Sequence, residues 1–276
     1  MPTLPALPSD ADLRRQIQFS AADGRIWLAG QRMVLMHAAS LGILRRELMH
    51  TLGPTAARRL LLRVGYASGE RDAALARQLR PGADAFAMFS VGPQLHMLQG
   101  AVQVAPRRLE LDMASGHFHG IFDWQHSWEV ETHVRDFGAQ HNAVCWTLLG
   151  YASGYTSAFM GRTVLYKEVQ CAACGHAHCR IEGRPVQDWP DGAQVASDYA
   201  PDALALPEGA RTPVAWPPPV PAEDRPEPPA DALGQLIGRS TGFNAATQLL
   251  RKAASTQVTV LLTGETGVGK ERFARA

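Results

Sequence analysis

Three of the four cysteines in this chain lie in one short stretch, residues 166–180. Between Glu168 and Cys179 this stretch holds one carboxylate, three thiols and two imidazoles. Thiolate and imidazole are the ligands that Zn²⁺ prefers, and a Cys-x-x-Cys followed by glycine makes a tight turn on which two sulfurs can converge. The chain is therefore expected to fold around a metal site; free thiols and surface histidines are the simpler alternative. Spacing alone favours three cysteines plus one further ligand: Cys171, Cys174 and Cys179, with either Cys145 or His178.

Charge and hydropathy exclude several classes of protein. The 27 basic and 26 acidic residues nearly cancel, so no overall field draws this segment to DNA. No apolar run approaches the roughly 20 residues that span a bilayer, and residues 1–20 offer no signal-peptide core. The sequence thus predicts a soluble, cytoplasmic protein that does not bind membranes. In that compartment cysteines bind metals more often than they form disulfides.

The first hundred residues read as an arm followed by helices. Residues 1–20 are polar and rich in proline, which predicts a mobile arm or one that exchanges onto a partner subunit. Apolar side chains share one side of a helix over residues 32–50, and Pro54 suits the first position of a second helix that ends near residue 80. A third apolar stretch, residues 85–98, carries His96.

The periodicity then changes to that of strands. Alternation predicts a hairpin over residues 109–124, whose second strand has an aromatic face with Phe122 and Trp124 and a polar opposite face. A helix over 140–160 follows, with aromatic residues every four positions. Two more strands, 163–170 and 180–182, flank the cysteines. This order predicts an α+β domain that ends near residue 183.

The pentapeptide Gly-Tyr-Ala-Ser-Gly occurs twice, at Gly65–Gly69 and at Gly150–Gly154. Two glycines four positions apart on a helix leave a groove that another helix can approach closely. We therefore interpret both copies as helix-packing sites.

Residues 184–230 are rich in proline, and twelve of the 19 prolines lie between Pro185 and Pro229. This composition predicts a linker, partly in the polyproline II conformation, between two functional parts.

A further segment, residues 231–276, contains a phosphate-binding loop. A continuous apolar run, Val258–Leu262, leads into Gly264-Glu265-Thr266-Gly267-Val268-Gly269-Lys270-Glu271. Backbone amides of such a loop cradle phosphates and Lys270 reaches the outer ones, although Glu271 replaces the Ser or Thr that ligates Mg²⁺. Because the sequence stops six residues after Lys270, we expect no ATP hydrolysis by this piece.

Together these motifs resemble the aromatic-responsive, sigma-54-dependent transcriptional activators of the XylR/DmpR type. Their ATPase loop also carries Glu after the lysine, and Ile237-Gly238-Arg239-Ser240 is similar to the start of their ATPase domain. Residues 21–183 resemble their effector-sensing domain, the second half of which looks like a four-vinyl-reductase domain. The resemblance implies a zinc-stabilised α+β sensor, a linker and the first part of an α/β P-loop AAA+ domain, truncated early.

The resemblance also implies a different set of zinc ligands from the one that spacing favours. In this family a cysteine is followed by a Glu-x-x-Cys-x7-Cys arrangement, which here corresponds to Cys145, Glu168, Cys171 and Cys179. Cys174, His176 and His178 then become secondary candidates. A closed cage of three thiolates and one carboxylate indicates a structural rather than a catalytic metal.

The same resemblance places an aromatic effector between the helix with His96 and the strand with Trp124. An indole N–H only donates a hydrogen bond and a neutral imidazole nitrogen can accept one, which together suit a phenol hydroxyl. The expected apolar wall consists of Phe89, Phe122, Tyr155 and Tyr166. Benzene or toluene would leave both polar groups unpaired, at about 1–3 kcal/mol, so phenols are preferred. Read singly, His96 and Trp124 are also ordinary core residues.

The leading hypothesis is a one-component sensor that is not itself an enzyme. Effector binding would act through the linker to release an ATPase that uses ATP and Mg²⁺ and remodels the sigma-54 RNA polymerase complex. The resemblance implies a homodimer, a higher oligomer when active, and DNA binding by a C-terminal domain absent from this sequence. The alternatives are a sensor of benzene, toluene or xylene, a zinc enzyme with His176 or His178 as base fused to an ATPase fragment, and a structural zinc domain that only dimerises.

Overall fold

The computed structural model describes residues 7–20, 23–200, 247, 250, 253, 260–263 and 270–275. The chain divides into two compact units, residues 1–212 and 213–276. In the second unit Lys270 begins helix α10 (Lys270–Arg275), which includes Glu271. The rest of the predicted phosphate loop, Gly264 to Gly269, lies outside the described residues, as do residues 201–230 of the predicted linker.

The first unit opens with a short helix and a small sheet. Helix α1 (Ala11–Arg15) precedes strands β1 (Ile17–Ser20), β2 (Arg25–Leu28) and β3 (Gln31–Met33), which pair antiparallel in that order. The helix predicted over 32–50 is therefore wrong at its start. Ala29 and Gly30 both have positive φ and turn the chain back, so that Met33 pairs with Ile26. Residues 7–20, predicted as part of a mobile arm, include Leu13, which is fully buried.

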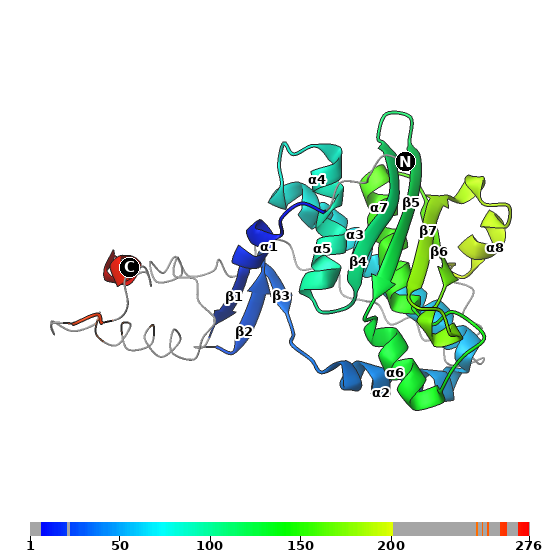
Figure 1. Ribbon diagram of the computed structural model, residues 1–276, viewed down its shortest axis with the longest axis horizontal. Coiled ribbons are helices and arrows are strands. Elements are labelled where there is room, and N and C mark those ends of the chain that lie inside the picture. The colour runs from blue at the N-terminus through cyan, green and yellow to red at the C-terminus, as the bar shows by residue number, and fades with distance from the viewer. Residues whose placement is uncertain are drawn as a thin grey trace, which may run out of the picture. The chain divides into compact units, whose positions relative to one another are not determined.

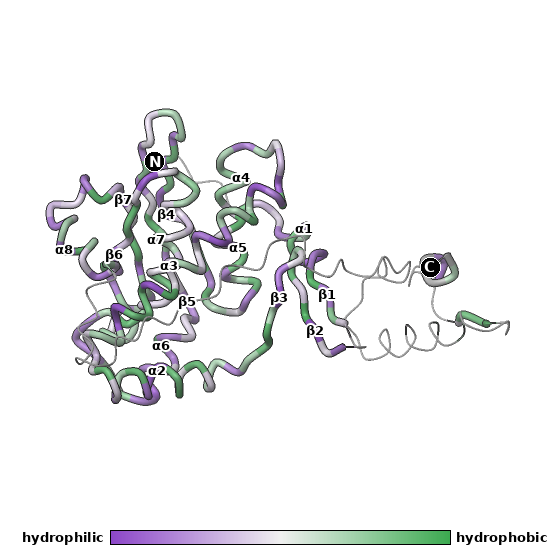
Figure 2. Tube along the Cα trace, turned by 180° about the vertical axis from the view of Figure 1, so that it is seen from behind, coloured by the Kyte–Doolittle hydropathy of each residue, from purple (hydrophilic) through white to green (hydrophobic). Residues whose placement is uncertain are grey.

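Four helices follow, with boundaries set by glycine, proline and an aspartate cap. They are α2 (Ala38–Leu52), α3 (Pro54–Leu79), α4 (Ala85–Phe89) and α5 (Val91–Leu98). Gly53, with φ of 78°, ends α2, and α3 starts at Pro54 as predicted. Asp84 caps α4 by accepting a hydrogen bond from the Ala87 amide at 2.7 Å. Figure 2 shows the connection from β3 to α2 as hydrophobic, and Val34, Leu35 and Met36 are exposed there.

The main sheet has four antiparallel strands in the order β4-β5-β7-β6 (Figure 1). They are β4 (Gln103–Asp112), β5 (His117–Gln125), β6 (Val164–Gln170) and β7 (Cys179–Pro185). The predicted strands are thus present, and the aromatic face of β5 is buried. The opposite face is polar as expected, although Asp123 is itself buried beneath Arg107 and Arg180, which lie 2.6 Å from its carboxylate.

Two helices connect β5 to β6, and the sequence predicted only one of them. Helix α6 (Trp128–Phe137) was missed, although the Ser127 side chain caps its start and Gly138 ends it. The second, α7 (Trp146–Met160), starts six residues later than the predicted helix over 140–160. The amide of Cys145 donates to the Glu168 carboxylate at 3.0 Å, and this contact holds the chain before Trp146 in a non-helical conformation.

Helix α7 lies on one face of the sheet, and α3 packs on α7 (Figure 1). The two Gly-Tyr-Ala-Ser-Gly copies meet at this contact, which confirms their interpretation as packing sites. A Cβ added at Gly65 would lie 2.0 Å from the carbonyl oxygen of Thr147, and one at Gly150 would lie 2.0 Å from that of Leu62. Only glycine allows the two backbones to approach this closely.

Residues 184–200 pack on the rest of the first unit, although the sequence assigns residues from 184 onward to the linker. They form the 3₁₀ turn η2 (Val186–Asp188) and helix α8 (Gly192–Ser197). The indole N–H of Trp189 donates to the carbonyl oxygen of Leu165 at 3.0 Å, and Asp198 pairs with Arg59 at 3.2 Å. None of the helices among the described residues is long and apolar enough to cross a membrane.

Candidate functional site: a four-donor cluster beside an aromatic cavity

Four ligand atoms from three parts of the chain converge at one edge of the main sheet. They belong to Cys145 before α7, Glu168 on β6, Cys171 just after β6, and Cys179 at the start of β7, and all lie within 4.8 Å of one another. The sulfurs of Cys145 and Cys179 are 3.8 Å apart. A tetrahedral ion with metal–sulfur bonds of about 2.3 Å separates its sulfurs by about 3.8 Å. A disulfide would need about 2.05 Å, so the cluster has the dimensions of a metal site.

The carboxylate of Glu168 has one oxygen that is free to bind a cation. One oxygen accepts the Cys145 amide, and the other, Oε1, is buried and has no hydrogen-bond partner in the described part of the chain. Burial, together with the nearby Cys171 sulfur, raises the pKa of Glu168 to about 8, and burial raises the pKa of the Cys145 thiol above its usual value. An orphaned oxygen among three thiols is therefore what a bound cation would satisfy.

The residues that only spacing favoured lie outside this group. Cys174 is half-buried at the end of the 3₁₀ turn η1 (Ala172–Cys174) and lies close to the Cys171 thiol, but its sulfur is not among the four converging atoms. His176 Nδ1 lies 3.0 Å from the carbonyl oxygen of Cys171, and His178 lies 3.2 Å from the Asp123 carboxylate. Of the two ligand sets that the sequence offered, the structure brings together the one with Glu168. Spacing could not show this, because the turn geometry of η1 decides which thiols converge.

A buried ion pair fixes the position of Cys145 in the cluster. Arg45 on α2 and Glu129 on α6 are almost fully buried and paired with each other. The Glu129 carboxylate also accepts the amides of Thr147 and Leu148, both at 3.0 Å, and so caps the first turn of α7. Sequence reasoning missed this pair, because its members are 84 positions apart and neither belongs to a motif.

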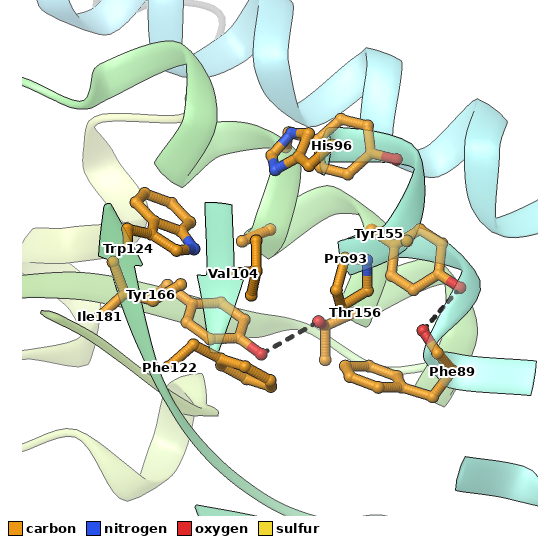
Figure 3. Close-up of a pocket in the computed structure, with 13 residues that line it drawn as sticks. Phe89, Pro93, His96, Val104, Phe122, Trp124, Tyr155, Thr156, Tyr166 and Ile181 are labelled. Carbon is orange, nitrogen blue, oxygen red and sulfur yellow. Dashed lines mark hydrogen bonds between the residues drawn. The ribbon is translucent and has the colours of Figure 1, made fainter. Parts of the chain in front are cut away.

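An apolar cavity lies between α5, α7 and the buried face of β5, and all six predicted effector residues line it (Figure 3). They are Phe89, His96, Phe122, Trp124, Tyr155 and Tyr166. The rings of His96 and Trp124 are 6.3 Å apart between centroids and tilted by 69°. Figure 3 shows nitrogen atoms of both rings on the sides that face the space between them.

Some polar groups that line this cavity have a hydrogen-bond partner and others have none among the described residues. Tyr155 donates its hydroxyl proton to the carbonyl oxygen of Phe89 at 3.0 Å, and Thr156 donates to the Tyr166 hydroxyl at 3.3 Å. In contrast, neither the imidazole of His96 nor the indole N–H of Trp124 has a hydrogen bond to any described residue. Burial lowers the pKa of His96 to about 3, so the imidazole is neutral near pH 7 and offers one acceptor nitrogen.

The cavity is narrow because aromatic side chains fill most of it. Its volume is about 30 Å³, which is room for about one water molecule. Tyr151, which the sequence placed on the aromatic side of its helix but not in the site, stacks on His96 with 3.8 Å between ring centroids. Stacking continues along α7 through Tyr155 to Phe159. A phenyl ring is larger than this volume, so side chains that line the cavity must move for an aromatic ligand to enter.

Comparison with known proteins assigns the chain to a family. Residues 12–112 match the family described as "Activator of aromatic catabolism", residues 124–185 the four-vinyl-reductase domain and residues 236–276 the sigma-54 interaction domain. The phenol-responsive sensory domain of the transcription activator PoxR, solved with phenol, is 47% identical, with a TM-score of 0.68 over 70% of this chain and 96% of that one. This chain belongs to the XylR-type activators of aromatic catabolism.

Two full-length members of this family are similar over nearly all of the chain. The phenol regulator MopR of Acinetobacter guillouiae is 40% identical and the regulatory protein XylR of Pseudomonas putida is 39% identical, each over 96% of the chain. The chain spans about half the length of these curated relatives, 47% and 46%. The matches to the four-vinyl-reductase domain and to the sensory-domain structure confirm the predicted α+β sensor fold followed by the start of a sigma-54 activator domain.

Proposed function

We propose that residues up to about 200 form the phenol-sensing part of a sigma-54-dependent activator. The observation that carries this proposal is that His96 and Trp124, two polar side chains lining the same largely apolar cavity, have no hydrogen bond to any described residue. A phenol hydroxyl would donate to the His96 nitrogen and accept from the Trp124 N–H. Toluene or benzene would bury both groups without partners, at about 1–3 kcal/mol. The descriptions of MopR as a phenol regulator and of PoxR as phenol-responsive support this choice.

We propose that the four-donor cluster holds a structural Zn²⁺ ion. Three thiolates and one carboxylate complete a tetrahedron, so no position remains for the water that a zinc hydrolase needs. The ion would join the β6–β7 pair to the start of α7. It also lies next to the effector site, because Cys179 pairs with Trp124 across β7 and β5, and Glu168 follows Tyr166 by two residues on β6. The cluster would thus hold Trp124 in register, which is a role in sensing rather than in catalysis.

For the whole protein we propose the activity of its family. Effector binding in the first unit would act through the linker on an AAA+ ATPase that binds ATP and Mg²⁺ with residues 264–271. The complete regulator would assemble as a homodimer and then a higher oligomer, contact sigma-54 RNA polymerase and bind DNA through a further domain. The match of residues 236–276 to the sigma-54 interaction domain supports this proposal.

Calorimetric titration of phenol into the full chain tests the effector site. We expect Trp124→Phe and His96→Ala each to weaken binding by about tenfold, since each removes one hydrogen bond to the hydroxyl. His117→Ala, at an exposed position of β5, is the matched control and should bind phenol normally. Normal affinity in both pocket variants would refute the assignment.

Metal content tests the cluster separately. Purified chain analysed by elemental mass spectrometry should contain one zinc per chain, and Cys145→Ser should lose it. Cys174→Ser should retain the zinc, because that thiol lies outside the group. Loss of zinc from the Cys174 variant with retention in the Cys145 variant would reverse the assignment.

A further inference from the structure

Behind the stacked rings of the cavity lies a carboxylate that no motif predicted. The hydroxyl of Tyr151 donates to Oδ2 of Asp72 on α3 at 2.8 Å. Burial raises the pKa of Asp72, opposed by the hydrogen bond from Tyr151, the positive charge of Arg71 and a hydrogen bond from Gln99. The hydrogen bond from Tyr151 links this carboxylate to the wall of the cavity.

The Tyr151 ring is the surface on which His96 rests. The two rings are 3.8 Å apart between centroids and tilted by only 31°, whereas Trp124 meets His96 edge to face at 6.3 Å. Because the imidazole has no hydrogen bond among the described residues, packing alone sets the plane of its ring. The orientation of its acceptor nitrogen thus depends on where the Tyr151 ring lies.

The helices on both sides of this contact are closely packed, so the side-chain hydrogen bond is what restrains the ring. A Cβ added at Gly69 would lie 2.2 Å from the carbonyl oxygen of Tyr151, which shows how closely α3 and α7 approach here. Asp72 follows Gly69 by three residues and so shares its side of α3. With the helices fixed, the remaining freedom of Tyr151 is rotation of its side chain, and the bond to Asp72 restrains that rotation.

We infer that Asp72 is a positioning residue of the effector site: through Tyr151 it holds the His96 imidazole so that one nitrogen accepts the effector hydroxyl. This inference rests on the proposed phenol-sensing function. It also gives Tyr151 a defined part in selectivity. Because the phenolic proton of Tyr151 is donated to Asp72, Tyr151 does not compete as a donor to the effector hydroxyl, which leaves the Trp124 indole N–H to donate and a His96 nitrogen to accept.

A double-mutant cycle with calorimetric phenol titration of the full chain tests the inference. Asp72→Ala should weaken phenol binding by about threefold to tenfold, the size of coupling expected between contacting groups. Asp72→Asn, which keeps an acceptor oxygen for Tyr151, should restore affinity to near that of the parent chain. In a His96→Ala background, Asp72→Ala should change phenol affinity no further, because the group that it positions is gone.

The outcomes separate the possible failures. An equal loss from Asp72→Ala in the parent and in the His96→Ala background would show a general structural role and overturn the inference, as would unchanged affinity in the parent. If His96→Ala itself binds phenol normally, the proposed function fails instead. Should Asp72→Ala not fold, Tyr151→Phe serves in its place: it keeps the stacked ring, removes the hydroxyl, and should show the same dependence on His96.

Discussion

Gly150→Ala would place a methyl group against the backbone of α3. The added Cβ lies 2.0 Å from the carbonyl oxygen of Leu62, about 1.4 Å closer than ordinary van der Waals contact. At an exposed helical position the same substitution stabilises by about 1 kcal/mol, because alanine favours the helix. Here overpacking of about 1–3 kcal/mol opposes that gain and α3 must move away from α7. Because the clash is with backbone rather than with a flexible side chain, the upper part of that range, about 2–3 kcal/mol, applies and leaves a net loss of about 1–2 kcal/mol.

Thermal unfolding followed by circular dichroism measures this effect. For a domain of this size the loss corresponds to a Tm that is lower by about 2–8 °C. Ser68→Ala, an exposed position on α3, is the control and should shift stability by less than about 0.5 kcal/mol. Phenol affinity should fall as well, because Tyr151 and Tyr155 line the cavity from α7. An unchanged or higher Tm for Gly150→Ala would refute the close helix contact.

Three further predictions concern the buried ion pair and the imidazole. Glu129→Gln leaves Arg45 buried without the negative charge of its partner, so the free energy of unfolding should fall by about 3–5 kcal/mol. Urea titration measures this loss, and the exposed control Glu110→Gln should lose less than about 0.5 kcal/mol. Burial lowers the pKa of His96 to about 3, below the value near 6.5 of an unfolded chain, so the folded chain binds fewer protons between these values. Its contribution to stability is present above about pH 6.5 and is lost as pH falls toward 3, and pH-dependent unfolding of the parent and His96→Ala should differ accordingly. Phenol affinity should stay constant from about pH 6 to about pH 9, where both the ligand and the imidazole are neutral.

Elements whose boundaries are set by residues adjacent in the sequence could be predicted from the sequence alone. Pro54 begins α3, residues 117–124 form a strand with one aromatic face, and the aromatic stripe of α7 lines the cavity. Each of these features follows from φ restriction or from periodicity within one segment. The small β1–β3 sheet escaped prediction because its strands of three or four residues are too short for a periodic signal. Helix α6 was missed although Ser127 and Gly138 mark its two ends.

The same distinction holds for the site residues: some could be predicted from the sequence and others depend on the tertiary fold. Its aromatic residues could be named from the sequence once the family resemblance supplied their arrangement, and the structure places all six around one cavity. The metal ligands could not be chosen from spacing, because Cys174 forms a Cys-x-x-Cys motif with Cys171 but its sulfur is not among the four atoms that converge. The roles of Glu129 and Asp72 could not be predicted from the sequence. Each residue acts through contacts with residues 18 or more positions away, and only the tertiary fold creates those contacts.

The account depends on recognition of a hydroxyl group by one donor and one acceptor in a dry aromatic cavity. Calorimetric titrations of phenol and toluene into the same preparation of the full chain test it most directly, because the two ligands share a ring and a similar size and differ in the hydroxyl. If His96 and Trp124 pair with that hydroxyl, phenol should bind more tightly by about 5- to 150-fold, which corresponds to about 1–3 kcal/mol. Equal dissociation constants, or tighter binding of toluene, would contradict the account.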